Sequence, residues 1–281
     1  MCEFCHKHGE GKKWYLEAKN YAEDLLADAR RRRFVEHFFM HPEILKRDER
    51  NARSLDRLPP AVRSMVVQGI TRRQKKVHFG QVVPIEDVER IFSLVNSVVR
   101  LACICRHVSI RREARYCYGV SLGPDGGALA GILRGLDRSF VNGPEARGLE
   151  TLAKDEALSA IRSHEHEGLC HTVWTFQTPF IGGLCNCDRT DCMAMRWTVT
   201  NGIPVMFRAE TIAAVDPDAC NGCRTCMRVC QFGALSFSAS SRKCTVDNRF
   251  CYGCGVCRAA CSRNVIRLEE RTTVPAAQAL W

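Results

Sequence analysis

The sequence CNGCRTCMRVC at residues 220–230 has the same cysteine spacing as CYGCGVCRAAC at residues 251–261. Both segments follow the pattern C-x2-C-x2-C-x3-C. Three thiolates this close together can wrap three irons of one cubane, so the fourth ligand has to arrive from elsewhere in the chain. This spacing is typical of [4Fe–4S] binding, and in two-cluster proteins the fourth cysteine of each run ligates the other cluster. The repeated run therefore predicts two [4Fe–4S] clusters.

The crossing of the fourth cysteines divides the ligands into two expected sets. One cluster is assigned to Cys220, Cys223, Cys226 and Cys261, and the other to Cys230, Cys251, Cys254 and Cys257. Eight cysteines could also bind two tetrahedral zinc ions. Zinc sites typically use cysteine pairs separated by a longer span, with no third cysteine two residues on, so the spacing favours iron–sulfur.

Residues 211–268 resemble a dicluster ferredoxin domain of the bacterial type. Besides the cysteines, the resemblance rests on the lead-in VDPDAC at 215–220 and the exit CQFGAL at 230–235. It implies single-electron transfer. The family usually has proline after each fourth cysteine, whereas this chain has Gln231 and Ser262. Because proline lacks an N–H group, each replacement adds a donor near a cluster sulfur. Such donors, and the basic character of the segment, predict reduction potentials higher than those of a small acidic ferredoxin.

The composition indicates a globular protein that keeps its thiols for metal. The chain has 281 residues, of which 46% are hydrophobic and 18 are cysteine. Its start, MCEF, leads directly into polar sequence without the apolar core of a signal peptide, and no apolar run is long enough to span a bilayer. We therefore expect a cytoplasmic protein with reduced cysteines rather than a secreted disulfide scaffold.

The formal net charge is +10, and Arg30–Arg33 is the densest basic cluster. Nucleic-acid binding is one interpretation, but no known reader motif accompanies the cluster, so we do not expect it. Steering toward an acidic redox partner is a second interpretation. A solvated helix face is the plainest explanation and the favoured one. The expected partners are redox proteins or a larger, anaerobic oxidoreductase complex.

The pattern along the chain predicts an α+β protein in three parts and a tail. Residues 1–80 read as a helical region, with helices over 12–40, 42–58 and 61–76. Residues 81–208 read as a small α/β domain that contains CxC loops. Its expected elements are helices over 85–97 and 154–167 and strands over 98–106 and 169–176. Residues 209–270 form the ferredoxin domain, and residues 271–281 are expected to be a mobile tail.

Six further cysteines are candidates for a third metal site. Cys103 and Cys105 are expected on one face of a strand, with Cys117 downstream, and a second loop carries the remaining three. If the two strands are parallel neighbours, both loops lie at one end of the sheet. The candidate ligands are Cys103, Cys105, Cys117, Cys185, Cys187 and Cys192. The alternative is a set of structural thiols or a redox dithiol.

Other chemistry-bearing residues receive plainer interpretations. Cys2 and Cys5, followed by His6 and His8, form a weak candidate metal site at the N-terminus. Cys170 and Cys244 are expected to be small core residues, and His171 a satisfied core histidine. The glycine-rich stretch 119–135 lacks the spacing of a phosphate-binding loop, so turn chemistry explains it better.

The motifs CICR at 103–106, EGLCH at 167–171 and LCNC at 184–187 give a second resemblance. They are similar to those of bacterial and archaeal ferredoxin-fused proteins, in which a cysteine-bearing α/β-like region precedes a dicluster domain. Members often have more cysteines in the second loop, where this chain has Asp188. The sequence as a whole predicts an iron–sulfur electron-transfer protein. The alternatives are an oxidoreductase with catalysis at the Cys103–Cys192 site and a redox-responsive nucleic-acid-binding protein.

Overall fold

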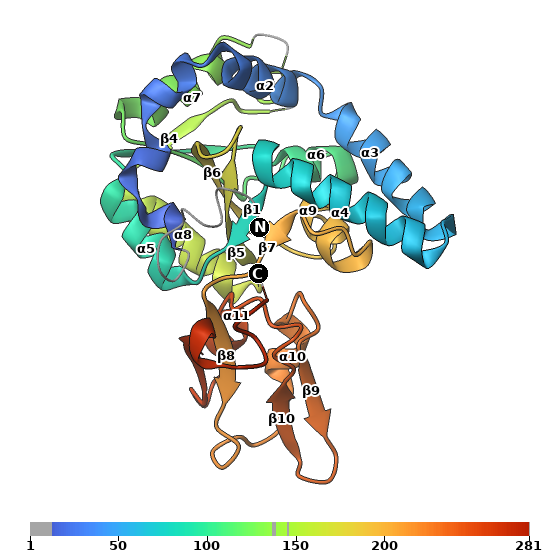
Figure 1. The fold of residues 1–281 in the computed structure, drawn as a ribbon. Helices are drawn as coiled ribbons and strands as arrows, with labels where there is room; N and C mark the ends of the chain where they lie inside the picture. The colour runs from blue at the N-terminus through green and yellow to red at the C-terminus, as the bar shows by residue number, and fades with distance from the viewer. Residues whose placement is uncertain (1–12, 137–138, 145, 281) are drawn as a thin grey trace.

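A seven-stranded sheet forms the centre of the computed structural model, which describes residues 13–136, 139–144 and 146–280 (Figure 1). The strand order is β4-β2-β3-β6-β5-β1-β7. The strands are β1 (Gly80–Val82), β2 (Ser97–Leu101), β3 (Cys117–Ser121), β4 (Glu150–Leu152), β5 (Cys170–Thr175), β6 (Ile181–Cys187) and β7 (Met206–Phe207). Only the edge pair β1–β7 is parallel among these strands. Helices and strands together fit the predicted α+β class. The strands expected to be parallel neighbours, β2 and β5, are instead separated by β3 and β6.

One face of the sheet is covered by α5 (Ile85–Leu94) and α8 (Lys154–His166). Their apolar residues Val88, Ile91 and Ile161 are fully buried in one core with strand residues such as Val173. Both helices were predicted close to these bounds. Gly168, with φ of +91°, follows α8 and adopts the left-handed conformation that ends a helix.

The N-terminal segment does not form the continuous helix predicted over 12–40. Residues 14–27 form three short 3₁₀ turns, and α2 (Ala29–Met40) begins only after Asp28. The Asp28 carboxylate accepts a hydrogen bond from the Arg30 backbone at 2.8 Å and so caps the helix. The turns bury Trp14 and Tyr15 beneath the sheet, and the Tyr15 hydroxyl donates to Asp87 at 2.7 Å. Burial of these aromatic side chains overrides the helical periodicity.

Helices α2, α3 (Glu43–Ser54), α4 (Pro60–Val77), α6 (Ile104–Ile110), α7 (Gly127–Arg134) and α9 (Met193–Met195) lie toward the other face (Figure 1). The predicted helices over 42–58 and 61–76 correspond to α3 and α4. Val35 and Phe39 of α2 pack in one core with Leu101 and Leu133. The basic run is not entirely solvated, because Arg31 is buried and its guanidinium donates to two backbone carbonyl groups after β5.

The C-terminal part consists of two small antiparallel pairs with two short helices (Figure 1). Strand β8 (Thr211–Val215) pairs with β11 (Ile266–Glu270), and β9 (Leu235–Ser238) pairs with β10 (Lys243–Val246). Helices α10 (Thr225–Val229) and α11 (Val256–Ala259) follow the two cysteine loops. The expected mobile tail instead packs here, because Ala277 is fully buried in the same core as Ile212. None of the described helices is long and apolar enough to cross a membrane.

Candidate metal centres

Six cysteines from four elements line one cavity on the α7–α9 face of the sheet. They are Cys103, Cys105, Cys117, Cys185, Cys187 and Cys192. Cys117 of β3 and Cys185 of β6 are directly opposed partners in the antiparallel ladder. Opposed residues project from the same face, and Cys187 returns to that face two residues later. The structure therefore brings all six candidates together, while metal ligation by them stays a prediction.

Cys103 and Cys105 do not lie on one strand, as the sequence had predicted. Strand β2 ends at Leu101, Cys103 is the N-cap of α6, and Cys105 lies in the first turn of that helix. The helical start turns the two thiols toward different partners: Cys103 hydrogen-bonds with Cys117, and Cys105 with Cys192. The CxC spacing thus distributes its thiols over two groups.

The thiols influence one another's pKa values in two sets. One set contains Cys103, Cys117 and Cys185, and the other contains Cys105, Cys192 and Cys187. The bond with Cys192, followed by burial, raises the pKa of Cys105 well above its usual value. The bond from Cys117 favours the Cys185 thiolate, but burial and neighbouring thiols outweigh it and raise the pKa of Cys185 to about 12. Without a bound cation the Cys105 and Cys185 thiols are neutral at pH 7, so binding of a metal by them would release protons.

Arg106 is a buried cation beside the thiols, and the sequence interpretation had given it no role. Its guanidinium is only 4% exposed and lies 3.7 Å from the Cys103 sulfur. It pairs with Asp188, donates to the Asn186 carbonyl at 3.1 Å and lies over the Tyr116 ring at 4.3 Å. Asp188 therefore acts as the counterion of Arg106.

Two further contacts hold this end of the sheet. The Tyr116 backbone N–H donates to the Cys103 sulfur at 3.0 Å, a contact of the kind that stabilises a thiolate. His171, predicted as a core histidine, is fully buried and its Nδ1 lies 2.6 Å from the Asn186 side-chain oxygen. Burial lowers the pKa of His171 to about 4, so the ring is neutral at pH 7. Asn186 lies between Cys185 and Cys187, and this pair therefore fixes the strand that carries both thiols.

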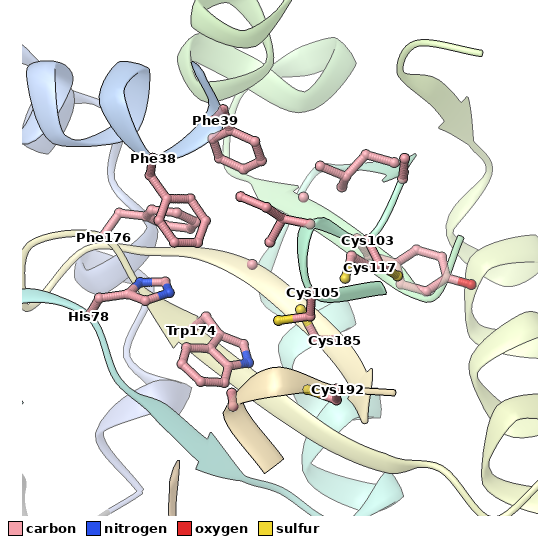
Figure 2. A pocket seen from close by; sticks show the side chains of 18 of the residues that line it. Phe38, Phe39, His78, Cys103, Cys105, Cys117, Trp174, Phe176, Cys185 and Cys192 are labelled. Carbon is pink, nitrogen blue, oxygen red and sulfur yellow. The ribbon is translucent and has the colours of Figure 1, made fainter. Parts of the chain in front are cut away.

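The cavity above the thiols has a volume of about 160 Å³ and two chemically different ends. Figure 2 shows Cys103, Cys105, Cys117 and Cys185 on one side and Phe38, Phe39, Phe176 and His78 on the other. Helix α2 supplies Phe38 and Phe39. Among the described residues, no three His, Cys, Asp or Glu side chains are grouped so that they could hold a single metal ion.

A second, smaller cavity lies in the C-terminal part and has a volume of about 20 Å³. The cysteines that line it are Cys230, Cys251, Cys254 and Cys257, the set assigned to one cluster from the sequence. Three of them come from one loop, and Cys230 arrives from the other run. The loop adopts φ of +73° at Gly253, where a Cβ atom would lie 2.0 Å from the Thr211 carbonyl oxygen. Glycine is therefore required for the loop to wrap this cavity.

The other predicted set meets around Cys226. Burial raises the pKa of Cys226 to about 12, with Cys223 and Cys261 among the neighbours whose charge would act on it. Cys261 comes from the second run, as the crossing pattern predicts. Cys223 is exposed, so this site lies nearer the surface than the first. Cys244, predicted as a hairpin core residue, is buried in β10 and its thiol also hydrogen-bonds with Cys220 and Cys226.

Comparison with known families agrees with this C-terminal arrangement. A family model described as a 4Fe-4S binding domain matches residues 212–235, which include the first cysteine run. The match supports an iron–sulfur domain at residues 212–235, and the C-terminal part, residues 211–270, is called the 4Fe–4S domain below. No curated protein matches the chain. The match covers the first half of the repeat, so a second cluster and the role of the preceding 210 residues are taken up as proposals below.

The 4Fe–4S domain contacts the sheet through Cys170. This residue is fully buried on β5 and is the directly opposed partner of Cys187 on β6. Its thiol donates to the His171 backbone carbonyl at 3.7 Å, and its closeness to Cys254 of the 4Fe–4S domain is the largest influence lowering the pKa of Cys254. The predicted core cysteine therefore lies between the six-thiol cavity and the four-cysteine cavity. Phe232 and Val256 pack around it in one apolar cluster.

Gln231 joins the same two regions by hydrogen bonds. Its side-chain amide donates to the Gly168 carbonyl at 2.8 Å and accepts from the Arg189 backbone N–H at 2.9 Å. The backbone N–H that reaches the Cys230 sulfur belongs to Ala234, at 3.3 Å. Replacement of proline by Gln231 was expected to add a hydrogen-bond donor near a cluster sulfur. The side chain of Gln231 instead connects the 4Fe–4S domain to the residue after α8 and to the loop after β6.

The glycine-rich stretch binds a carboxylate of the chain itself, that of Glu23. Glu23 accepts hydrogen bonds from Ser121 at 2.6 Å and from the backbone N–H groups of Gly123 and Ala128, both at 3.1 Å. These N–H groups precede and begin α7, where an anion is favoured. The preference for turn chemistry over phosphate binding thus agrees with the structure.

Proposed function

We propose that this chain transfers single electrons by means of two [4Fe–4S] clusters in its C-terminal domain and a third cysteine-ligated centre at the six thiols. Its partners would be redox proteins or the subunits of a larger oxidoreductase. The family match supports iron–sulfur binding, and the shared placement of the six thiols supports the additional centre. When bound, such clusters supply one-electron redox chemistry.

The donor atoms suit this cofactor. Four thiols surround the small cavity of the 4Fe–4S domain, and backbone N–H groups reach two of their sulfurs, those of Cys251 and Cys230. At the six-thiol cavity, the Tyr116 N–H and the Arg106 guanidinium supply comparable contacts to Cys103. Hydrogen bonds and positive charge at the sulfur stabilise the more negative, reduced form. Both sites therefore contain the sulfur ligands and the polar contacts that an iron–sulfur centre needs.

The position of Cys170 is the observation that carries this proposal. It is close enough to Cys254 to be the largest influence on the pKa of that thiol and is directly opposed to Cys187, so one residue separates the two groups of thiols. The surrounding side chains, including Phe232 and Tyr252, whose ring centroids lie 4.0 Å apart, exclude water from this junction. A dry, packed junction favours electron exchange between two fixed sites over exchange with solvent.

Iron and sulfide quantitation with EPR spectroscopy on anaerobically purified protein tests the proposal. About twelve irons per chain would support two cubanes and a third centre of the same kind. About eight would remove the third centre and leave a two-cluster protein. Zinc in place of iron would overturn the assignment as a whole.

A second candidate function is an oxidoreductase with catalysis at the six-thiol cavity. The specific observation in its favour is the size of this cavity, about 160 Å³ against about 20 Å³ for the four-cysteine cavity. A site that only stores an electron has no need of this additional space. Turnover of an organic substrate that stops when Cys105 or Cys192 is replaced, with the C-terminal clusters intact, would favour this function over simple electron transfer.

A further inference from the structure

The larger cavity contains an aromatic end that no thiol occupies. Phe38 of α2, Phe176 after β5 and Trp174 of β5 surround the ring of His78. The centroid of the His78 ring lies 4.7 Å from that of Phe38, 4.9 Å from Trp174 and 5.2 Å from Phe176. Figure 2 shows these rings across the cavity from the cysteines. A group of rings at these distances is suited to contact another flat ring.

The hydrogen bond of His78 fixes its tautomer. Its Nδ1 lies 2.5 Å from the backbone carbonyl oxygen of Thr175. Because a carbonyl oxygen can only accept, Nδ1 carries the proton. Burial lowers the pKa of His78 to about 4, so the ring is neutral at pH 7 and Nε2 is an unprotonated acceptor. Figure 2 shows the ring directed into the cavity between Phe176 and Trp174.

Among the polar side chains of the cavity lining, the His78 ring is the one packed among the aromatic rings. Arg106 is already paired with Asp188, Asn186 is bonded through both ends of its amide, and the Asp48 carboxylate lies 3.8 Å from the Arg47 guanidinium. Gln74 of α4 is a further uncharged polar residue of the lining. A charged ligand would lose its hydration without gaining a counterion among the aromatic rings, which is costly. The chemistry therefore favours a neutral molecule.

We propose that this end of the cavity binds a small, neutral, planar aromatic molecule that carries one hydrogen-bond donor, such as a phenol. The ring would contact Phe38, Trp174 and Phe176, and the donor would bond to His78 Nε2. An apolar cavity of about 150 Å³ is known to accept benzene, and the whole of this cavity, thiol end included, measures about 160 Å³. The inference goes beyond electron transfer, and the ring contacts and the hydrogen bond that carry it lie at the end away from the thiols.

The test compares three probes on the full chain purified with its clusters: phenol, toluene, which matches phenol in size, and anisole, which carries a methyl group on the phenol oxygen. Isothermal titration calorimetry is expected to show saturable binding of one phenol per chain, with an affinity about tenfold above those of anisole and toluene, because only phenol donates a hydrogen bond. His78→Phe keeps an aromatic ring and removes the acceptor, so its affinity for phenol should fall to that for toluene. His166→Phe, at an exposed histidine of α8, is the matched control and should behave like the native chain.

Phe38→Ala separates stacking from hydrogen bonding. It should weaken the binding of all three probes by a similar factor, about fivefold, and leave the preference for phenol intact. Absence of saturable phenol binding would overturn the proposal. Equal affinities of phenol and anisole for the native chain would overturn it as well, and that comparison needs no variant to fold. Saturable phenol binding to a chain that holds no iron at the six thiols would reject only the proposed third centre.

Discussion

The two cysteine-lined cavities of this molecule are built in different ways. In the 4Fe–4S domain, three thiols come from one loop of seven residues, 251–257, and the fourth comes from the preceding run. At the six-thiol cavity, the cysteines come from the start of α6, from β3, from β6 and from the start of α9. The first site needs a local loop conformation, whereas the second needs the sheet register and the helix positions to be correct together.

This difference has an energetic consequence. A loop that wraps a cluster can tolerate changes far from it, because few long-range contacts define its geometry. A site assembled across a sheet shares the stability of the sheet. Buried polar groups such as Arg106 and His171 support it and are costly to disturb. We therefore expect ligand changes to separate the two centres and changes to supporting residues to affect only the larger one.

Removal of a ligand of the 4Fe–4S domain should have the largest effect. Cys254→Ala is expected to lose about four irons per chain, because one cubane loses a thiolate. Iron analysis and EPR spectroscopy measure the loss. Cys244→Ala, at a buried cysteine outside the repeated run, is the matched control and should retain its iron. An equal loss of iron in both variants would contradict the assignment of Cys254 as a ligand and of Cys244 as a residue that binds no iron.

Arg106→Gln should test the dependence of the larger site on its buried cation. The variant leaves Asp188 without its partner, so the free energy of unfolding is expected to fall by about 3 kcal/mol. Chemical denaturation followed by circular dichroism measures the change. Arg112→Gln, at an exposed arginine just after the same helix, should change it by less than about 0.5 kcal/mol. A small effect at Arg106 would mean that water enters the site.

His171 should make the stability of the sheet region depend on pH. Its pKa is lowered to about 4 in the folded chain, below the ordinary value of about 6.5, so the unfolded chain binds the extra proton between these values. The contribution is complete above pH 6.5 and is lost as the pH falls toward 4; from pH 7 to pH 5 it should fall by about 2 kcal/mol.

Thermal melts of the native chain and of His171→Asn at pH 7 and pH 5 test this expectation. The variant should lose part of the pH dependence, while His166→Asn, at an exposed histidine, should keep it. No histidine occurs from residue 211 to the C-terminus, so this effect belongs to the sheet region. If the melting temperature of His171→Asn changes between pH 7 and pH 5 as much as that of the native chain, protonation of the buried His171 ring does not limit the stability.

Gln231→Ala tests the hydrogen bonds that join the 4Fe–4S domain to the sheet region. The variant removes the two hydrogen bonds to Gly168 and Arg189, so the free energy of unfolding should fall by about 1 kcal/mol. Denaturant titration measures the change. Ser262→Ala, at the exposed equivalent position after the other fourth cysteine, should leave the stability unchanged. Equal losses would indicate that the position matters through its backbone rather than through the junction.

Cys170→Ala is expected to have the smallest effect. It removes the polar thiol that lowers the pKa of Cys254, an influence that favours negative charge on this sulfur and so stabilises the reduced state of a cluster held there. A net polar interaction of about 1 kcal/mol corresponds to a potential about 40 mV lower. An EPR-monitored redox titration measures the shift, and Cys170→Ser, which keeps a polar hydrogen at this position, should restore most of it. Equal potentials for the alanine variant and the native chain would contradict this influence of Cys170 on Cys254.

The sequence predicted the local features of this molecule well. The cysteine spacing indicated the 4Fe–4S domain, and the start of α4 at Pro60 and the end of α8 before Gly168 follow from residues that begin and end helices. The antiparallel register that places Cys117 opposite Cys185 could not be read from periodicity, because pairing depends on segments about 70 residues apart. The role of Arg106 was missed for the same reason, since its partners become neighbours only in the folded chain.

The N-terminal segment shows how tertiary contacts override a local pattern. The apolar residues of 12–27 recur at helical intervals, and yet Trp14 and Tyr15 are buried through 3₁₀ turns. One signal was present in the sequence: Asp28 is a preferred N-cap residue immediately before the arginine run, and it marks the true start of α2.

The ladder between β5 and β6 also limits how this protein can evolve. Cys170 opposes Cys187, and Cys117 opposes Cys185, so the same face of three adjacent strands presents thiols. Insertion or deletion of a single residue within β6 would turn its cysteines to the opposite face, toward α5 and α8. Homologous proteins that keep these thiols should therefore vary freely in the helices and keep the length of this strand constant.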